Sequence, residues 1–174
     1  ISLKSIMLIP FVTTLVVGII LWYVLATPIQ AMTTGLTNWL EGMSGANAAL
    51  MSAILGGMMA FDMGGPINKI AYAFGVASFS SGSFGPSTAM LLGIAIPPFG
   101  MFLATILNKK LYDESERDNA KTAMIMGLVG ITEGTIPFAV KDPLRVIPSI
   151  VVGTAVACGL NGFFGVTQET MLST

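Results

Sequence analysis

A carboxylate isolated from other charges lies inside a long apolar segment that glycine and proline interrupt. Residues 130–145 read Gly-Ile-Thr-Glu-Gly-Thr-Ile-Pro-Phe-Ala-Val-Lys-Asp-Pro-Leu-Arg, and Glu133 has no Lys, Arg or Asp within seven residues on either side. A charge at membrane depth costs about 2.5–3.5 kcal/mol on insertion scales, so an acid retained there indicates function. Broken backbone is tolerated at that depth only where it is buried in protein or lines a water-filled cavity. The segment therefore predicts a binding site for a polar solute in a membrane transporter.

A second interruption occurs at 62–69, which reads Asp-Met-Gly-Gly-Pro-Ile-Asn-Lys. Paired Gly/Pro breaks in apolar segments are the best sequence pointer to a transporter's binding site. Carboxylates there accept hydrogen bonds, amides and hydroxyls both donate and accept, and sugar hydroxyls need that mixture. The candidate substrate-binding residues are Glu133, Thr132, Gly134, Asp62, Asn68 and Lys69.

Each candidate also has a structural reading. Glu133 could be a structural carboxylate that pairs with a distant Lys or Arg. For Asp62 and Lys69, solute contact and an ion pair that holds the break closed are equally compatible with the sequence. Asn68 could instead cap a helix that begins near Ile70.

The charged residues around Pro143 favour a structural role over a substrate contact. They mark a membrane boundary or a pairing that fixes a hairpin, and they are Lys141, Asp142 and Arg145. Pro143 predicts a break in the helix in either case.

The overall composition is that of a membrane protein. Hydrophobic residues make up 53% and charged residues 10% of the 174 residues, against about 25% charged in soluble domains. The absence of histidine and the single cysteine exclude an internal disulfide and a His/Cys metal cluster, so we expect neither a metal nor a cofactor. The net charge of −1 argues against a nucleic-acid partner. Cys158 is interpreted as a small packing residue in a helix.

The distribution of charges and apolar runs predicts an all-α, polytopic membrane protein with broken re-entrant hairpins. Turn-forming residues at 80–87 predict a loop, and residues 29–44 predict an amphipathic helix at the interface or a short buried helix. The charged stretch 109–121 predicts a solvated loop that leads into a helix, placed in the cytoplasm by the positive-inside rule. The remaining predicted apolar segments are 5–26, 46–61, 70–79, 88–107 (kinked by Pro97 and Pro98), 120–129 and 146–166.

The chain begins at Ile1 without a methionine and has no charged flank after Glu169. We therefore expect residues 1–174 to be a single transmembrane domain that is part of a longer protein.

Three stretches carry a resemblance to a known family. They are Gly-Gly-Met-Met-Ala-Phe-Asp-Met-Gly-Gly-Pro-Ile-Asn-Lys-Ile-Ala-Tyr-Ala-Phe at 56–74, Ile-Thr-Glu-Gly-Thr-Ile-Pro-Phe-Ala at 131–139 and Asp-Pro-Leu-Arg-Val-Ile-Pro at 142–148. With Asn-Trp-Leu at 38–40 and the paired prolines at 97–98, the chain resembles the membrane (IIC, or EIIC) subunit of a bacterial phosphotransferase-system sugar permease of the fructose type. The similarity extends over essentially the whole chain.

The resemblance implies the permease component of a phosphoenolpyruvate-dependent sugar phosphotransferase in the bacterial inner membrane. Such a subunit moves a transport domain against a dimeric scaffold, and its sugar, fructose or a related hexose, is phosphorylated on release inside. The phosphate arrives through IIA and IIB domains, with a phosphocysteine on IIB as the final donor; the resemblance places both domains outside these residues. It also implies that a full IIC subunit is about twice this length.

The resemblance also implies roles for the candidate residues. Glu133 would contact the sugar from a re-entrant hairpin, and the segment with Asp62, Asn68 and Lys69 would form the other side of the site. Other branches of the superfamily have a histidine at the sugar, and this chain has none. Either the family's further C-terminal segments supply additional groups or Asp62 takes that role.

Two other functions remain open at this stage. One is an ion-coupled secondary transporter with Glu133 and Asp62 as proton or sodium sites, and the other is a non-transporting receptor or scaffold.

Overall fold

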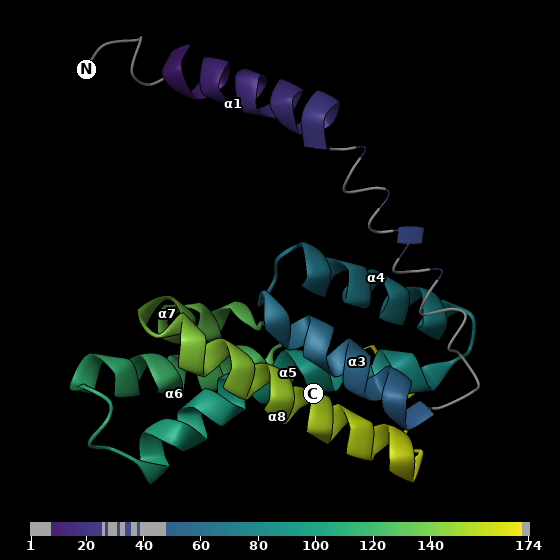
Figure 1. The fold of residues 1–174 in the computed structure, drawn as a ribbon, viewed down its shortest axis with the longest axis vertical. Coiled ribbons are helices and arrows are strands. Elements are labelled where there is room, and N and C mark those ends of the chain that lie inside the picture. The colour runs from purple at the N-terminus through teal and green to yellow at the C-terminus, as the bar shows by residue number, and fades with distance from the viewer. Residues whose placement is uncertain are drawn as a thin grey trace. The chain divides into compact units, whose positions relative to one another are not determined.

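The computed structural model describes residues 8–25, 27, 31, 34–35, 38 and 48–171. The chain divides into two compact units, Ile1–Glu41 and Gly42–Thr174, which are treated separately. Within the described residues all regular secondary structure is helical (Figure 1). The predicted all-α class is therefore confirmed.

The N-terminal unit contains one continuous helical stretch. Helix α1 (Ile9–Ile20) starts beside Pro10 and continues as the π-helical η2 (Leu21–Leu25). Its apolar side chains are exposed within the unit, with Trp22 and Tyr23 near the end. The ends of the predicted span, 5–7 and 26, and nearly all of the predicted helix at 29–44 lie outside the described residues.

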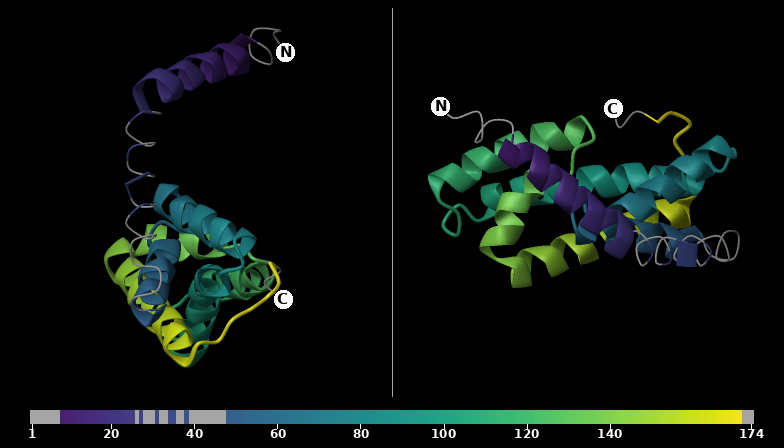
Figure 2. Two further views of the ribbon diagram at one scale, coloured as in Figure 1. Left: turned by 90° about the vertical axis from the view of Figure 1, so that its right-hand side faces the viewer. Right: turned by 90° about the horizontal axis from the view of Figure 1, so that it is seen from above.

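The C-terminal unit is a bundle of helices interrupted at two places. Its elements are α3 (Ala48–Phe61), α4 (Pro66–Ser80), α5 (Phe84–Leu107), α6 (Glu114–Leu128), the 3-10 turn η3 (Glu133–Thr135), α7 (Ile136–Lys141) and α8 (Pro143–Phe164). Helix α3 lies alongside α8, and α5 contacts α3, α4, α6 and α8 (Figure 2). Helix α5 is thus the central element of the bundle.

Small residues allow α3 and α8 to pack closely. A Cβ added at Gly56 would lie 2.6 Å from the Sγ of Cys158, and one at Gly162 would lie 2.5 Å from the Oγ of Ser52. Small residues at interfaces of this kind let helix backbones approach in membrane proteins. Cys158 is fully buried, which confirms its interpretation as a packing residue.

The helix boundaries differ from the predicted ones mainly at their starts. The predicted apolar segments at 88–107 and 146–166 correspond to α5 and α8, the two described helices that are long and apolar enough to cross a membrane. The predicted loop at 80–87 is shorter, because α5 begins at Phe84. Helix α4 begins at Pro66, four residues before the predicted start at Ile70, because proline is well suited to a first helical turn.

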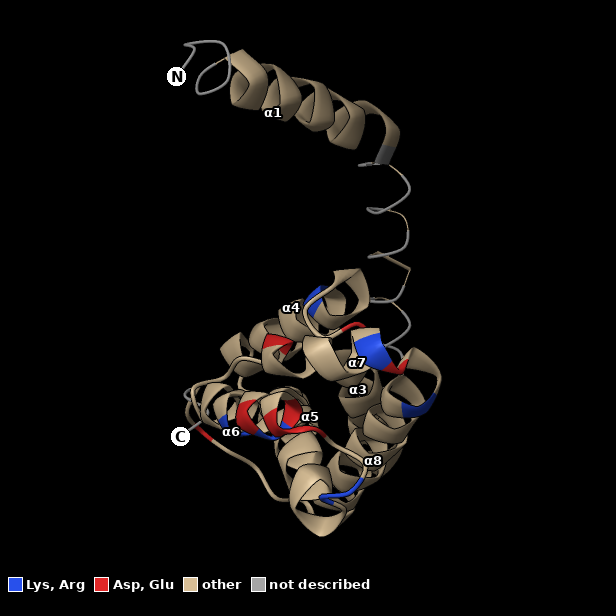
Figure 3. Ribbon diagram, turned by 90° about the vertical axis from the view of Figure 1, so that its left-hand side faces the viewer, with Lys and Arg blue, Asp and Glu red and all other residues tan. Residues whose placement is uncertain are grey.

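The charged stretch is a short turn followed by α6, as predicted. Asp113 and Glu116 form a capping box, in which each side chain accepts a hydrogen bond from the other residue's backbone N–H. The Nζ of Lys141, at the end of α7, lies 2.8 Å from Glu116 Oε1 and 3.3 Å from Asp113 Oδ2. This pairing ties α7 to α6, in agreement with the structural role expected for Lys141. Figure 3 shows charged residues gathered at this end of the unit.

A buried apolar cluster packs the helices next to both interruptions together. It joins α3, α5, α6, α7 and α8, together with the first break, through Ala60, Met63, Met101, Ala120, Phe138, Ala139 and Ile150. The broken segments are therefore anchored on a packed core.

Candidate functional site

The two interruptions of the sequence meet in the folded unit. The Nζ of Lys69, in the first turn of α4, lies 4.0 Å from the Oε1 of Glu133, at the start of η3. A Cβ added at Gly64 would lie 2.5 Å from that same oxygen. The structure thus brings together the broken segments that the sequence indicated, with the Glu133 carboxylate at the point of contact.

In the first break, Asp62 binds the start of the helix that follows it. The Asp62 carboxylate accepts hydrogen bonds from the backbone N–H groups of Ile67 (2.7 Å) and Asn68 (2.9 Å). These N–H groups lie in the first turn of α4, where the helix supplies no acceptor and its dipole favours a negative charge. Lys69 pairs with Glu133. Of the two alternatives left open for Asp62 and Lys69, an ion pair between them is not the one that closes the break: Asp62 binds backbone N–H groups, and the ammonium of Lys69 lies near Glu133.

Asn68 faces the protein interior. Its side chain is buried and its Nδ2 donates a 2.6 Å hydrogen bond to the carbonyl of Met59. Met59 is in the last turn of α3, where carbonyls have no partner within the helix. The alternative that Asn68 caps α4 is not what the structure shows: the helix begins two residues earlier, and Asp62 satisfies its first N–H groups.

Thr132 compensates for a proline in the neighbouring helix. Pro98 has no N–H, so the carbonyl of Ile94, four residues earlier in α5, loses its helical partner. The buried hydroxyl of Thr132 donates to that carbonyl at 3.4 Å. This contact holds the segment before Glu133 against α5.

Gly134 allows the turn that carries Glu133 to lie directly on α6. A Cβ at this position would be 2.8 Å from the Cα of Ala123, and a backbone atom cannot move aside cheaply. Gly130 has a φ of 83° where the chain leaves α6. The expectation that the backbone is broken at Glu133 is confirmed, and the two glycines explain it; Pro137 instead lies in the first turn of the short helix α7.

The six predicted site residues therefore fall into two groups. Glu133 and Lys69 keep 44% and 64% of their side chains exposed, and their 4.0 Å separation leaves both groups able to bind a solute. The other four shape the two breaks: Asp62, Asn68, Thr132 and Gly134.

Sequence reasoning missed two neighbours of Glu133. Gly64 has a φ of 111° and leaves the space into which the Glu133 carboxylate projects. Thr135 is fully buried, and its hydroxyl has no hydrogen-bond partner in the part of the chain that is described. The Gly-Gly pair beside Asp62 was the available signal for Gly64. Across the described residues, no three His, Cys, Asp or Glu side chains gather closely enough to hold a metal ion.

Comparison with known proteins identifies the relatives of this chain. It is 44% identical to the "PTS system fructose-specific EIIB'BC component" of Escherichia coli over 164 residues, which are 94% of this chain and 29% of that protein. It is 47% identical to the "Fructose-like permease IIC component 2" of the same organism over 158 residues, or 91% of this chain and 44% of that protein.

The chain is a homologue of fructose-type EIIC permeases. A third relative, the "Fructose permease IIC component" of Bacillus amyloliquefaciens, is 44% identical over 95% of this chain. This EIIC homologue spans between 29% and 54% of the length of these three relatives. No family model and no solved structure matches it.

Proposed function

We propose that this chain is part of the sugar-translocating EIIC subunit of a fructose-type phosphotransferase system. The proposal places it in the bacterial inner membrane as a multi-pass, homodimeric permease. It is supported by relatives named as fructose-specific EIIC components and fructose permeases at 44–47% identity and by two helices long and apolar enough to span a membrane.

The observation that carries the proposal is the open Glu133–Lys69 pair between the two breaks. A carboxylate accepts hydrogen bonds from sugar hydroxyls, and an ammonium group donates to them. At 4.0 Å the two groups attract each other without forming a close hydrogen bond. A sugar hydroxyl can therefore bridge the two groups, accepting from the ammonium and donating to the carboxylate, so that charge-assisted hydrogen bonds supplement the long ion pair.

The remaining candidate residues position this pair. Asp62 fixes the start of α4 and so the place of Lys69, while Thr132 and Gly134 fix the turn that carries Glu133. In this mechanism the chain binds the sugar and orients one hydroxyl. The phosphoryl group itself comes from a IIB domain that receives it from IIA, and two relatives are named as EIIB'BC and EIIABC components.

The decisive experiment measures sugar phosphorylation in membrane vesicles that contain the complete permease. Phosphoenolpyruvate and the general carrier proteins are supplied, and a panel of hexoses is tested with the wild type, Glu133→Gln and Glu169→Gln. Glu169 is exposed and lies outside both breaks, so it controls for loss of a carboxylate as such.

We expect one sugar to be phosphorylated by the wild type and by Glu169→Gln, and much more slowly by Glu133→Gln at a sugar concentration that does not saturate the wild type. Accumulation of free sugar that follows an ion gradient would contradict the proposal and favour an ion-coupled transporter. Absence of any sugar flux in the wild type would favour a non-transporting receptor.

A further inference from the structure

A pocket lies away from the Glu133 site, between α5 and α8. Its volume is about 280 Å³. Its walls include Ile96, Pro97 and Met101 from α5 and Val146, Ile150 and Thr154 from α8. None of the six candidate sugar-binding residues lines it, so it needs a separate explanation.

The walls of this pocket are the two helices able to cross a membrane. Helices α5 and α8 are the described segments with sufficient length and hydropathy to span the bilayer. The lining between them is mostly apolar, and two of its members are the exposed glycines Gly100 and Gly153, where an added Cβ would meet nothing within 4 Å. The pocket is therefore an open apolar groove between two helices suited to lipid.

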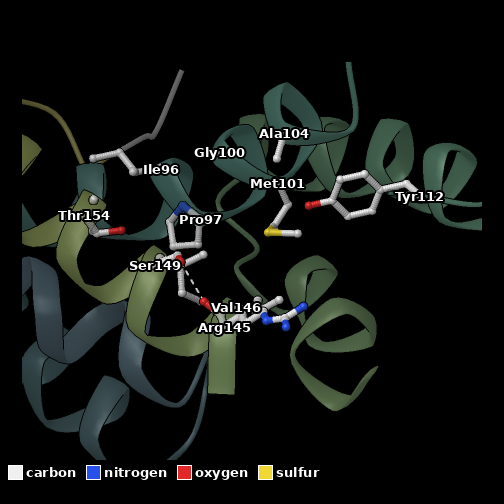
Figure 4. A pocket seen from close by; sticks show the side chains of 12 residues that line it. Ile96, Pro97, Gly100, Met101, Ala104, Tyr112, Arg145, Val146, Ser149 and Thr154 are labelled. Carbon is white, nitrogen blue, oxygen red and sulfur yellow. Dashed lines mark hydrogen bonds between the residues drawn. The ribbon is translucent and has the colours of Figure 1, made fainter. Parts of the chain in front are cut away.

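Polar side chains lie at both ends of the groove. Arg145 and Tyr112 lie at one end and Thr154 at the other (Figure 4). The Arg145 side chain is 89% exposed, and among the described residues it forms an ion pair with Asp142 at 3.5 Å. Thr154 follows Arg145 by nine residues, which is about 13 Å along a helix at 1.5 Å per residue. An amphipathic ligand with an anionic end matches this layout.

The position of Arg145 and Tyr112 at one end of the groove also agrees with an amphipathic, anionic ligand. Arg145 lies in the first turn of α8, immediately after the Lys141 pairing with α6. Tyr112 packs edge-to-face on Phe138 of α7, with ring centroids 6.4 Å apart. Tyrosine and arginine are typical of the boundary between lipid and water, and basic pockets between spanning helices bind anionic lipid headgroups.

We propose that this groove binds an anionic phospholipid, with one acyl chain between α5 and α8 and the phosphate on Arg145. The apolar walls remove the acyl chain from contact with polar groups, and the guanidinium donates charge-assisted hydrogen bonds to the phosphate oxygens. A free sugar suits the groove poorly, because its hydroxyls would be buried against carbon without partners. The proposal rests on the membrane location and not on the sugar site.

The test uses the complete permease reconstituted in lipid nanodiscs with a phosphatidylglycerol that carries a photoactivatable group near the end of one acyl chain. After irradiation, mass spectrometry maps the cross-linked peptides. We expect labelling of α5 and α8 at the groove. Gly153→Leu and Gly100→Leu should each lower this labelling about tenfold by filling the groove. Gly85→Leu, at another α5 glycine with open space, should leave it unchanged.

Two further variants identify the ligand's chemistry. Arg145→Gln should lower the preference for phosphatidylglycerol over a zwitterionic phospholipid in competition, by about tenfold. Thr154→Val should leave labelling unchanged, because an acyl chain does not use the hydroxyl, which has no partner among the described residues. Loss of a bound ligand in Thr154→Val would indicate a polar solute and overturn the proposal. Cross-links in the wild type that avoid the groove, or labelling that persists in both leucine variants, would show that the lipid is not held in the groove and would overturn the proposal.

Discussion

The two broken segments look alike in sequence but use their acids differently. Each has one carboxylate beside glycine and proline, yet both oxygens of Asp62 bind backbone N–H groups, whereas Glu133 remains half-exposed near Lys69. The difference follows from position. Asp62 precedes the first turn of α4 and can fold back onto it, while Glu133 is itself the first residue of η3. An acid before a helix tends to stabilise the break, and an acid within the break remains available for a ligand.

The largest expected effect is a loss of sugar affinity in Glu133→Gln, which would distinguish Glu133 from Asp62. Glu133→Gln should weaken sugar binding by about tenfold or more, because a hydrogen bond to a charged group contributes about 1.5–3 kcal/mol. The exposed Glu133–Lys69 pair itself contributes only about 0–1 kcal/mol, so thermal stability should change little. Equilibrium sugar binding and thermal unfolding of the purified permease measure both quantities. Equal losses in both would make Glu133 a structural residue like Asp62.

Gly64 tests whether the contact between the breaks matters. Gly64→Ala places a Cβ at a φ of 111° and 2.5 Å from the Glu133 carboxylate. We expect a loss of about 1–3 kcal/mol of stability from backbone strain, together with weaker sugar binding. Gly85→Ala, where the added Cβ meets nothing within 4 Å, is the control in the same assays. Unchanged sugar affinity in a folded Gly64→Ala protein would mean that the sugar does not depend on this approach.

Thr132 tests how the second break is held. Thr132→Val removes the hydroxyl that bonds the carbonyl left free by Pro98. The expected cost is about 1–2 kcal/mol, because that carbonyl becomes unsatisfied in a buried place. Thermal unfolding measures it, and Thr122→Val, at an exposed threonine of α6, is the matched control. An equal effect of both substitutions would remove the special role assigned to Thr132.

Asp62 tests the structural half of the comparison. Asp62→Ala should lower stability by about 1 kcal/mol, as loss of a helix cap does, whereas Asp62→Asn keeps one of the two acceptor oxygens and should lose less. Sugar affinity in Asp62→Asn should match the wild type. A loss of sugar affinity without a loss of stability would place Asp62 in the sugar site and erase the distinction between the two breaks.

The smallest expected effect is a pH dependence at the start of α6, away from both breaks. The backbone N–H of Glu116, with help from the Lys141 ammonium, holds the pKa of Asp113 below its usual value. A lowered pKa in the folded state means that this stabilisation is present above the unfolded pKa of about 3.9 and is lost as pH falls through the folded pKa. Hydrogen exchange of the first turn of α6 should therefore accelerate, relative to its intrinsic rate, only below about pH 4. Protection that already falls between pH 7 and pH 5 would contradict this assignment.

Much of the fold could be predicted from local features. Glycine and proline act on their own backbone, so both interruptions were visible, and hydropathy over 20 or so residues indicated α5 and α8. The alternative of Asn68 as a helix cap is not observed, because its actual partner, the carbonyl of Met59, becomes available only where α3 ends next to α4. The Asp62 cap was missed because it spans five and six residues, farther than the usual capping box.

The sequence by itself determined that this chain is helical and apolar, that it breaks twice, and that Glu133 is isolated from other charges along the chain. These are sums of local preferences and need no knowledge of packing. Only the tertiary structure decided that Glu133 is the acid that remains exposed and that Lys69 is its neighbour. It also decided that the hydroxyl of Thr132 donates to the carbonyl of Ile94 and that Arg145 lines a groove beside α5. These contacts join residues distant in the chain, such as the 38 positions between Thr132 and Ile94, and helix packing alone brings them together.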